Sequence, residues 1–299
     1  MTSKLKEWLG KGKTFNHCNQ NIFYLSEGAG ECLLMVHGYP YNGFDFNFLL
    51  PALAADFRVV IPDMIGMGFS DKPVDYSYQF KNHVHMYRSL LRHLGITEIH
   101  VLAHDLGNSV VQELLAQTEE GDNSLKIKSI AFLNGGLFSD VYRPRLIQVL
   151  LSKSPAVIGK FLSKLISKKS IEKATSSVFG KRTQPSQEQL DDFWYVLNYN
   201  HGKSLTWKIG RLVFEKDVHQ QRWIETMQRT KISMCFINGP ADPNSGIHMA
   251  KRYEELIPNP MVILLPEHIG HWPQIEAPEL VVEAFMTFHK NLAKEKIQE

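Results

Sequence analysis

Three side chains along the chain are of types that could together carry out a hydrolysis through a covalent intermediate: Asp105, Asp242 and His271. An aspartate has an ordinary pKa of about 3.9 and is ionised at neutral pH, so it can attack a saturated carbon bearing a leaving group without prior activation. A histidine can then activate water, and a second carboxylate can orient that histidine. The set predicts a hydrolase that passes through an ester between an aspartate and its substrate.

Asp105 lies between a predicted strand and a predicted helix. Residues 99–103 have the length of a buried strand, and after His104-Asp-Leu-Gly107 the apolar residues recur at helical spacing. A sharp strand–turn–helix connection of this kind, the nucleophile elbow, projects one side chain above a sheet and usually reads Gly-x-Ser-x-Gly. An aspartate before a helix is also a common helix cap. The motif alone leaves both interpretations open.

A second turn could supply hydrogen-bond donors to the same place. Residues 31–36 form an apolar run that leads into His37-Gly-Tyr-Pro40. A turn there could aim the backbone N–H of Tyr39 into the space above the sheet, where it would form an oxyanion hole with the N–H of Leu106. A strand-ending turn with no part in catalysis is the alternative.

Asp242 and His271 each follow a predicted strand. Residues 231–238 precede the turn that contains Asp242, and residues 261–265 precede a turn-rich loop that contains His271. Because open α/β sheets gather their functional groups at the carboxyl ends of the strands, we expect both side chains to lie near Asp105. Asp242 stands before a proline, so an ordinary turn residue is the other interpretation.

The elements that must position these residues form an α/β pattern. Apolar runs at 57–63 and 127–134 alternate with amphipathic helical patterns such as 78–94. This alternation predicts a mostly parallel central sheet with helices on both faces. Residues 14–26 predict an antiparallel hairpin at the edge of that sheet.

The alternation stops at residue 136 and resumes after residue 229. Between them the pattern is helical and rich in aromatic residues, with no buried strand. We therefore expect an α/β core formed by residues 1–135 and 230–299, and a helical cap formed by residues 136–229. Ligands of open α/β sheets bind where such a cap would lie, so we expect two or three of its aromatic side chains to line a pocket.

Composition limits the partners of the chain. A formal net charge of +2 gives no indication of a nucleic-acid partner. The 13 histidines show no Cys/His ligand spacing, so we expect neither a metal nor a cofactor, and we interpret His83, His85 and His93 as surface or packing residues. The three cysteines are expected to be reduced thiols: Cys18, Cys32 and Cys235. With no signal peptide and no long apolar span, we expect a soluble cytoplasmic protein.

Four motifs together resemble the epoxide hydrolase and haloalkane dehalogenase superfamily. They are the His37-Gly-Tyr-Pro40 turn, Asp63 with the glycine-rich loop at 66–73, the Asp105 elbow, and Gly270-His-Trp-Pro-Gln-Ile-Glu276. The resemblance implies an α/β-hydrolase fold with an inserted cap. It further implies that Asp105 is the nucleophile, His271 the water-activating base and Asp242 its orienting acid, with the N–H groups of Tyr39 and Leu106 holding the oxyanion. It assigns no such role to His268, and Asn134 stands near the place where some dehalogenases carry the acid.

The resemblance also bears on the leaving group. Dehalogenases of this superfamily usually carry tryptophan after the nucleophile, whereas this chain has Leu106, whose side chain donates no hydrogen bond. We therefore expect an epoxide hydrolase that acts on a small apolar molecule with water as co-substrate. Tyr142, Tyr195 and Tyr199 are candidates for protonating the opened ring. A haloalkane dehalogenase, a non-catalytic ligand-binding protein, and a hydrolase in which Asp105 is only electrostatic remain alternatives.

Overall fold

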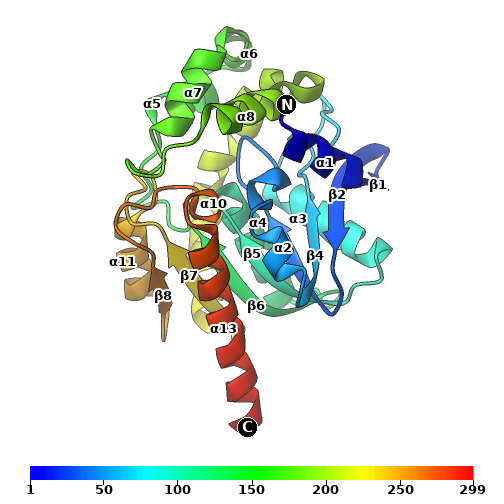
Figure 1. Cartoon of the computed structure of the whole chain (residues 1–299), viewed down its shortest axis with the longest axis vertical. Helices are drawn as coiled ribbons and strands as arrows, with labels where there is room; N and C mark the ends of the chain where they lie inside the picture. Colours follow the sequence, from blue (N-terminus) through cyan, green and yellow to red (C-terminus); the bar gives the residue numbers. More distant parts are fainter. Residues whose placement is uncertain (299) are drawn as a thin grey trace.

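A twisted eight-stranded sheet runs through the computed structural model, which describes residues 1–298 (Figure 1). The strands are β1 (Lys13–His17), β2 (Gln20–Glu27), β3 (Glu31–Val36), β4 (Phe57–Pro62), β5 (Glu98–Ala103), β6 (Lys126–Leu133), β7 (Ser233–Asn238) and β8 (Met261–Leu264). Their order in the sheet is β1-β2-β4-β3-β5-β6-β7-β8, and β3 to β8 are parallel. Strands β1 and β2 form the predicted antiparallel hairpin at one edge.

Helices cover both faces of the sheet. They are α1 (Ser3–Lys11), α2 (Leu50–Leu53), α3 (Phe80–His93), α4 (Leu106–Glu119), α11 (Ile247–Leu256), α12 (Pro273–Glu276) and α13 (Pro278–Gln298), with a short 3₁₀ helix η1 (Gly43–Phe46). Neighbouring residues of β5 separate the two faces, since Val101 packs with α3 and α4 while Leu102 packs with α13. Such strands are apolar on both sides, which is why they read as continuous apolar runs. The predicted fold class is confirmed.

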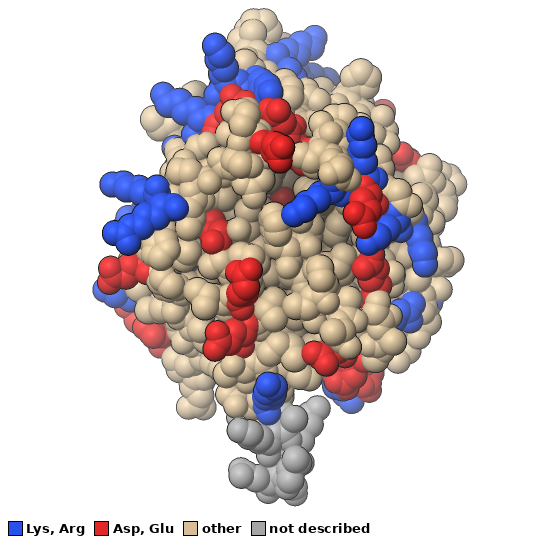
Figure 2. All heavy atoms as spheres, in the orientation of Figure 1, with Lys and Arg blue, Asp and Glu red and all other residues tan. Residues whose placement is uncertain are grey.

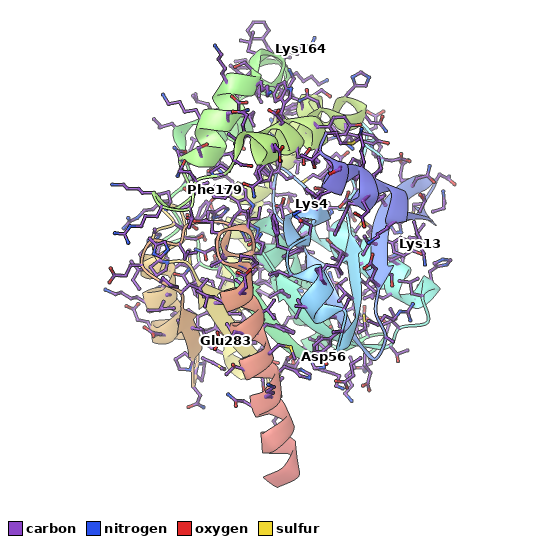
Figure 3. All side chains as sticks on the ribbon, in the orientation of Figure 1. Lys4, Lys13, Asp56, Lys164, Phe179 and Glu283 are labelled. Atoms are coloured by element: carbon purple, nitrogen blue, oxygen red, sulfur yellow. The ribbon has the colours of Figure 1, made fainter. Side chains whose placement is uncertain are left out.

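All remaining helices lie between β6 and β7. They are α5 (Leu146–Lys153), α6 (Ala156–Leu165), α7 (Lys168–Ser176), α8 (Gln187–Asn198), η2 (Tyr199–Leu205), α9 (Thr206–Ile209) and α10 (Leu212–Arg229). We call residues 146–229 the helical insertion. Helices α5 to α8 lie beyond one end of the sheet, and α13 extends toward the opposite end (Figure 1). In Figure 3, Lys164 marks the outer end of the insertion, and Phe179 marks its junction with the core.

Specific contacts fix the insertion on the core. The indole N–H of Trp223 on α10 donates to Glu113 on α4 at 2.8 Å, and Arg222 forms an ion pair with the same carboxylate at 2.6 Å. Phe179 stacks on Trp272, with ring centroids 5.1 Å apart. The insertion is thus tied both to the helix that follows Asp105 and to the loop that contains His271.

The surface of the described residues is mixed in charge. Acidic and basic side chains are interspersed over the face shown in Figure 2, in keeping with the formal net charge of +2. Within residues 1–298 no helix combines the length and hydropathy needed to cross a membrane.

Candidate active site

Asp105 occupies a strained turn between β5 and α4. Its backbone has φ 50° and ψ −116°, a conformation that non-glycine residues rarely adopt. The start of α4 lies so close to the end of β3 that a Cβ on Gly107 would lie 2.3 Å from the carbonyl oxygen of Val36. The carboxylate makes no capping hydrogen bond to α4. The helix-cap interpretation of Asp105 is therefore wrong, and the side chain is left free to face the space above the sheet.

The His37-Gly-Tyr-Pro40 turn meets this carboxylate. The backbone N–H of Tyr39 donates to Oδ2 of Asp105 at 3.0 Å. Buried His37 holds the turn in place, because its Nε2 accepts a hydrogen bond from the backbone N–H of Met64 at 2.8 Å. Leu106 is the first residue of α4, so its N–H has no partner inside the helix. Tyr39 and Leu106 line the same small recess beside Asp105.

Asp242 and His271 form a buried pair at the ends of β7 and β8. Nδ1 of His271 lies 2.7 Å from Oδ2 of Asp242. The other hydrogen bonds to the Asp242 carboxylate come from the Asn244 backbone N–H at 2.8 Å, the Ser245 hydroxyl at 2.5 Å and the Asn134 amide at 3.2 Å. Asn134 thus supports Asp242 as a neutral donor at the end of β6.

The electrostatics of this pair favour an ion pair. Burial opposes the charge on both groups, but their mutual attraction and hydrogen bonds outweigh it. The pKa of Asp242 is lowered to about 2, and that of His271 is raised to about 9, with Asp105 also raising it. His271 is therefore protonated and Asp242 is ionised at neutral pH. Its free nitrogen, Nε2, lies 3.7 Å from Oδ1 of Asp105.

The loop that carries His271 is held by Glu276. One carboxylate oxygen accepts the backbone N–H groups of Gly180 and Gly270 at 2.8 Å each, and the other accepts that of Trp272 at 3.0 Å. His268, in the same loop, faces a separate surface hollow with Arg182 and takes no part in the site. Glu276 thus accompanies His271 in the motif because its carboxylate holds the backbone of the loop that carries His271.

A cavity of about 570 Å³ opens above Asp105 and His271. Tyr39, Tyr41 and Trp272 form its core side. Aliphatic side chains of the insertion form much of the opposite wall: Leu162, Leu165, Ile166, Ile171, Val178 and Val213. This arrangement suits an apolar molecule whose reactive end meets a few polar groups.

A buried lysine beside Asp105 was missed by the sequence reasoning. Lys216 on α10 is only 4% exposed and borders the recess beside Asp105. Its Nζ lies 3.5 Å from the centroid of the Tyr142 ring and 3.4 Å from the carbonyl oxygen of Gly136. Burial lowers the pKa of Lys216 to about 8, against the opposing attraction of Asp105. A lysine in a helical insertion reads as a surface charge, so no local pattern could have found it.

The three candidate tyrosines lie in two different places in the structure. Tyr142 borders the recess with Asp105 and Lys216. Tyr199 instead packs edge-to-face on Phe69, with centroids 5.0 Å apart, and Tyr195 packs in the same apolar cluster. Burial, followed by the charges of Asp105 and Asp242, raises the pKa of Tyr142, so it is a weaker acid than Lys216. Phe193 and Phe179 line hollows other than this cavity.

One cluster of metal-ligating types occurs among residues 1–298, and it lies outside the cavity. His17, Cys18 and His85 bring one ligand atom each within 4.8 Å of one another. His85 is exposed and packs on His17, in keeping with its interpretation as a surface or packing residue. The sequence reasoning considered spacing along the chain, whereas the edge hairpin carries Cys18 to α3.

Comparison with known proteins identifies similar chains. The model of the family described as alpha/beta hydrolase fold matches residues 31–278. The mesoderm-specific transcript protein of Mus musculus is 33% identical over 297 residues, which cover 96% of this chain and 88% of that protein. Two solved structures share the fold: the epoxide hydrolase CorEH (19% identity, TM-score 0.77, covering 94% of this chain and 99% of that one) and the haloalkane dehalogenase DatA from Agrobacterium tumefaciens C58 (16%, 0.77, 94% and 97%).

Proposed function

This chain belongs to the α/β-hydrolase fold family, and from that premise we propose that it opens an epoxide through an ester on Asp105 and then hydrolyses the ester. The membership confirms the α/β-hydrolase fold that the resemblance implied. The observation that carries the proposal is a carboxylate, in place of serine, on a strained elbow 3.7 Å from a histidine that is paired with a second carboxylate.

In the first step, one oxygen of Asp105 attacks a ring carbon of the epoxide, and the carbon–oxygen bond to the ring oxygen breaks. The leaving oxygen takes a proton from a nearby acid. Lys216 is suited to this role because its pKa of about 8 keeps it protonated at neutral pH yet able to release the proton. The products of this step are a hydroxyalkyl ester on Asp105 and a neutral amine.

In the second step, His271 first releases its own proton to solvent and then takes a proton from water, which attacks the carbonyl carbon of the ester. Esterification removes the negative charge of Asp105, one of the causes that raise the pKa of His271. The imidazole therefore becomes easier to deprotonate when it is needed as a base. The N–H groups of Tyr39 and Leu106 would hold the oxyanion that forms. As it collapses, the proton on His271 passes to the leaving alkoxide and the diol is released. Asp105, Lys216 and His271 then return to their starting protonation states by exchange with solvent.

In this proposal residues 136–229 serve as a cap and residues 1–135 and 230–299 as the catalytic core. The insertion supplies the apolar wall of the cavity and the acid Lys216, while the core supplies Asp105, Asp242 and His271. A small apolar epoxide and water would be the substrates. An epoxide is preferred over an alkyl halide because the side chain of Leu106 cannot donate a hydrogen bond to halide, whereas Lys216 can protonate an oxygen.

The test is single-turnover mass spectrometry of the whole protein, mixed separately with styrene oxide and with a bromoalkane. We expect the His271→Gln variant to gain the full mass of styrene oxide, because ring opening loses no atoms, and to carry it on Asp105. A bromoalkane adduct would instead lack bromide. His268→Gln serves as a matched control in the same loop and should turn over without a trapped adduct, and Asp105→Asn should not be labelled.

Three results would reject the epoxide proposal. Labelling by the bromoalkane alone would support dehalogenation instead. If the parent protein turns the epoxide over but His271→Gln carries no adduct, the result would support direct attack by water, with Asp105 only electrostatic. Absence of both labelling and turnover in the parent protein, shown to be folded by circular dichroism, would support a ligand-binding protein.

A further inference from the structure

The edge hairpin packs its side chains against helix α3. Phe15 contacts the ring of His93, with centroids 4.9 Å apart, and His17, two residues later on the same face of β1, contacts the ring of His85 at 5.0 Å. Because His85 and His93 are about two helical turns apart, both contacts fall on one stripe of α3. The packing of Phe15 on His93 thus holds the hairpin against the helix beside the His17–His85 contact.

The hairpin turn brings a thiol to the same place. Cys18 and Asn19 connect β1 to β2, with φ values of 50° and 63°. Both residues have positive φ, as in the tight two-residue turns that favour asparagine and glycine. Asn19 suits this conformation, whereas Cys18 is an unusual residue for it. The turn thus carries an exposed cysteine directly beside buried His17.

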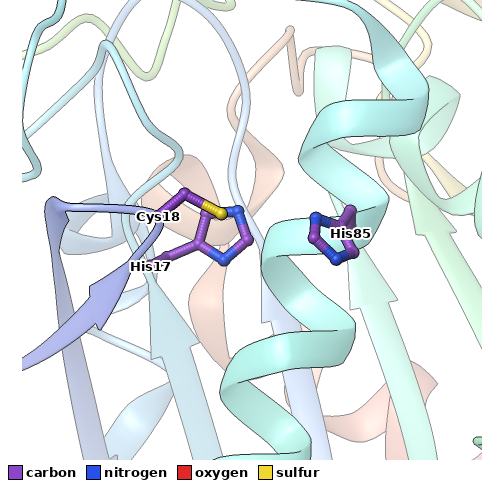
Figure 4. Close-up of side chains that lie close together, drawn as sticks. All are labelled: His17, Cys18 and His85. Carbon is purple, nitrogen blue, oxygen red and sulfur yellow. The ribbon is translucent and has the colours of Figure 1, made fainter.

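These three side chains face a shared space. Figure 4 shows the imidazole of His17 pointing across the gap toward His85, with the sulfur of Cys18 beside the His17 ring. One nitrogen of each histidine and the sulfur all lie within 4.8 Å of one another. Ligand atoms around one tetrahedral zinc ion lie about 3.5 Å apart. His85 is exposed on α3, so a rotation of its side chain can close the difference.

The imidazole nitrogens of the cluster are available as ligands, because a neutral histidine carries a nitrogen lone pair. Within the described residues, neither His17 nor His85 forms a side-chain hydrogen bond or an ion pair. The three donors are two imidazoles and a thiol, with no carboxylate among them. Zinc prefers such donors, whereas calcium and magnesium prefer oxygen ligands.

We propose that His17, Cys18 and His85 bind one zinc ion, with a solvent molecule as the fourth ligand. The ion would join the edge hairpin to α3 and so brace this end of the sheet. None of its ligands lines the cavity above Asp105, so the site is separate from the proposed reaction. Binding displaces the thiol proton of Cys18, and we therefore expect weaker binding as the pH falls.

The experiment uses the whole chain without a histidine tag, stripped with a chelator and titrated with Co²⁺ and then Zn²⁺. Co²⁺ should bind in one equivalent, with the intense visible bands of a tetrahedral site and a thiolate charge-transfer band, and Zn²⁺ should displace it. Cys18→Ser should abolish the charge-transfer band, and Cys18→Ser and His85→Ala should each raise the Kd at least tenfold. His93→Ala, on the same stripe of α3 but outside the cluster, should bind as the parent does.

Both test substitutions replace exposed side chains, so the variants should fold, which circular dichroism checks. Absence of a tetrahedral thiolate spectrum in the parent protein would overturn the proposal. So would parent-like affinity in either Cys18→Ser or His85→Ala, because metal would then be bound elsewhere. The readout is metal binding, so its outcome does not depend on whether the chain hydrolyses epoxides.

Discussion

At the scale of single residues, the charge on His271 decides the order of events in the proposed reaction. A base with a pKa of about 9 is protonated at neutral pH and cannot accept a proton from water. In the free protein this protonated ring neutralises two carboxylates at once, Asp242 at 2.7 Å and Asp105 at 3.7 Å. Ester formation removes the charge on Asp105 and so lowers the pKa of His271, which can then act as a base. The proposed nucleophile thereby controls when its own ester is hydrolysed.

Lys216 gives a prediction at this scale. Replacing it with methionine removes the proposed acid but keeps an apolar chain of similar length, and replacing a buried charge in this way often leaves the fold intact. We expect Lys216→Met to slow ester formation from styrene oxide about 100-fold, in line with the usual contribution of a general acid. Rapid-mixing mass spectrometry measures this step. In the parent, ester formation should decline above about pH 8 as Lys216 loses its proton.

The matched control is Lys208→Met. Lys208 lies in the same insertion, but its amino group bonds to the carbonyl oxygen of Val74, and it lines neither the cavity nor the recess. Its substitution should leave ester formation unchanged. Equal rates in Lys216→Met and the parent, or the same decline above pH 8 in both, would remove Lys216 from the mechanism.

At the scale of elements, the β5–α4 elbow depends on glycine. A Cβ on Gly107 would lie 2.3 Å from a backbone oxygen of Val36, and a backbone atom in a central strand cannot move aside. We expect Gly107→Ala to lower the free energy of unfolding by about 2 kcal/mol, the usual size of an overpacking penalty. Urea denaturation followed by circular dichroism measures it. Gly10→Ala in α1, where no heavy atom lies within 4 Å of the new Cβ, should be neutral or slightly stabilising; an equal loss in both variants would contradict this account.

Most elements of the core could be predicted because their local patterns agree with their environment. Strand β3 was predicted at its observed bounds, 31–36, because a strand buried on both faces is a continuous apolar run. Helix α3 was predicted from residue 78 but begins at Phe80, after Gln79 in an extended conformation. The helical content of the insertion could also be predicted, but not which of its faces would meet the core, since that depends on contacts such as Trp223 with Glu113.

At the scale of the whole molecule, the parts of the sites that escaped prediction all depend on contacts between distant segments. Asp105, Asp242 and His271 stand in a known order, and each follows a strand, so their meeting could be expected. Lys216 reaches Asp105 only because α10 docks on α4, and Cys18 reaches His85 only because the edge hairpin lies on α3. Neither contact is marked by a periodic pattern of residues in the sequence.

Burial of neutral histidines across the molecule should also make it sensitive to acid. Burial lowers the pKa of His83 to about 3 and that of His104 well below its ordinary value. The unfolded chain, with an ordinary histidine pKa of about 6.5, binds more protons than the folded chain below that pH, so the free energy of unfolding falls as the pH drops. Each such histidine contributes about 1.4 kcal/mol per pH unit. His271 acts in the opposite sense, since its stabilisation is complete below about pH 6.5 and is lost as the pH rises through about 9.

His83 allows this account to be tested without touching the proposed site. Neither of its ring nitrogens has a hydrogen-bond partner among the described residues, so leucine at this position removes a buried titrating group without leaving another polar atom unpaired. We expect His83→Leu to reduce the dependence of unfolding free energy on pH between 6 and 4 by about 1.4 kcal/mol per pH unit, with stability at pH 7 equal or higher. Urea titrations at several pH values measure this, with His93→Gln on the exposed side of α3 as the control. An unchanged slope in His83→Leu would mean that the ring is already protonated, or exposed to solvent, in the folded protein.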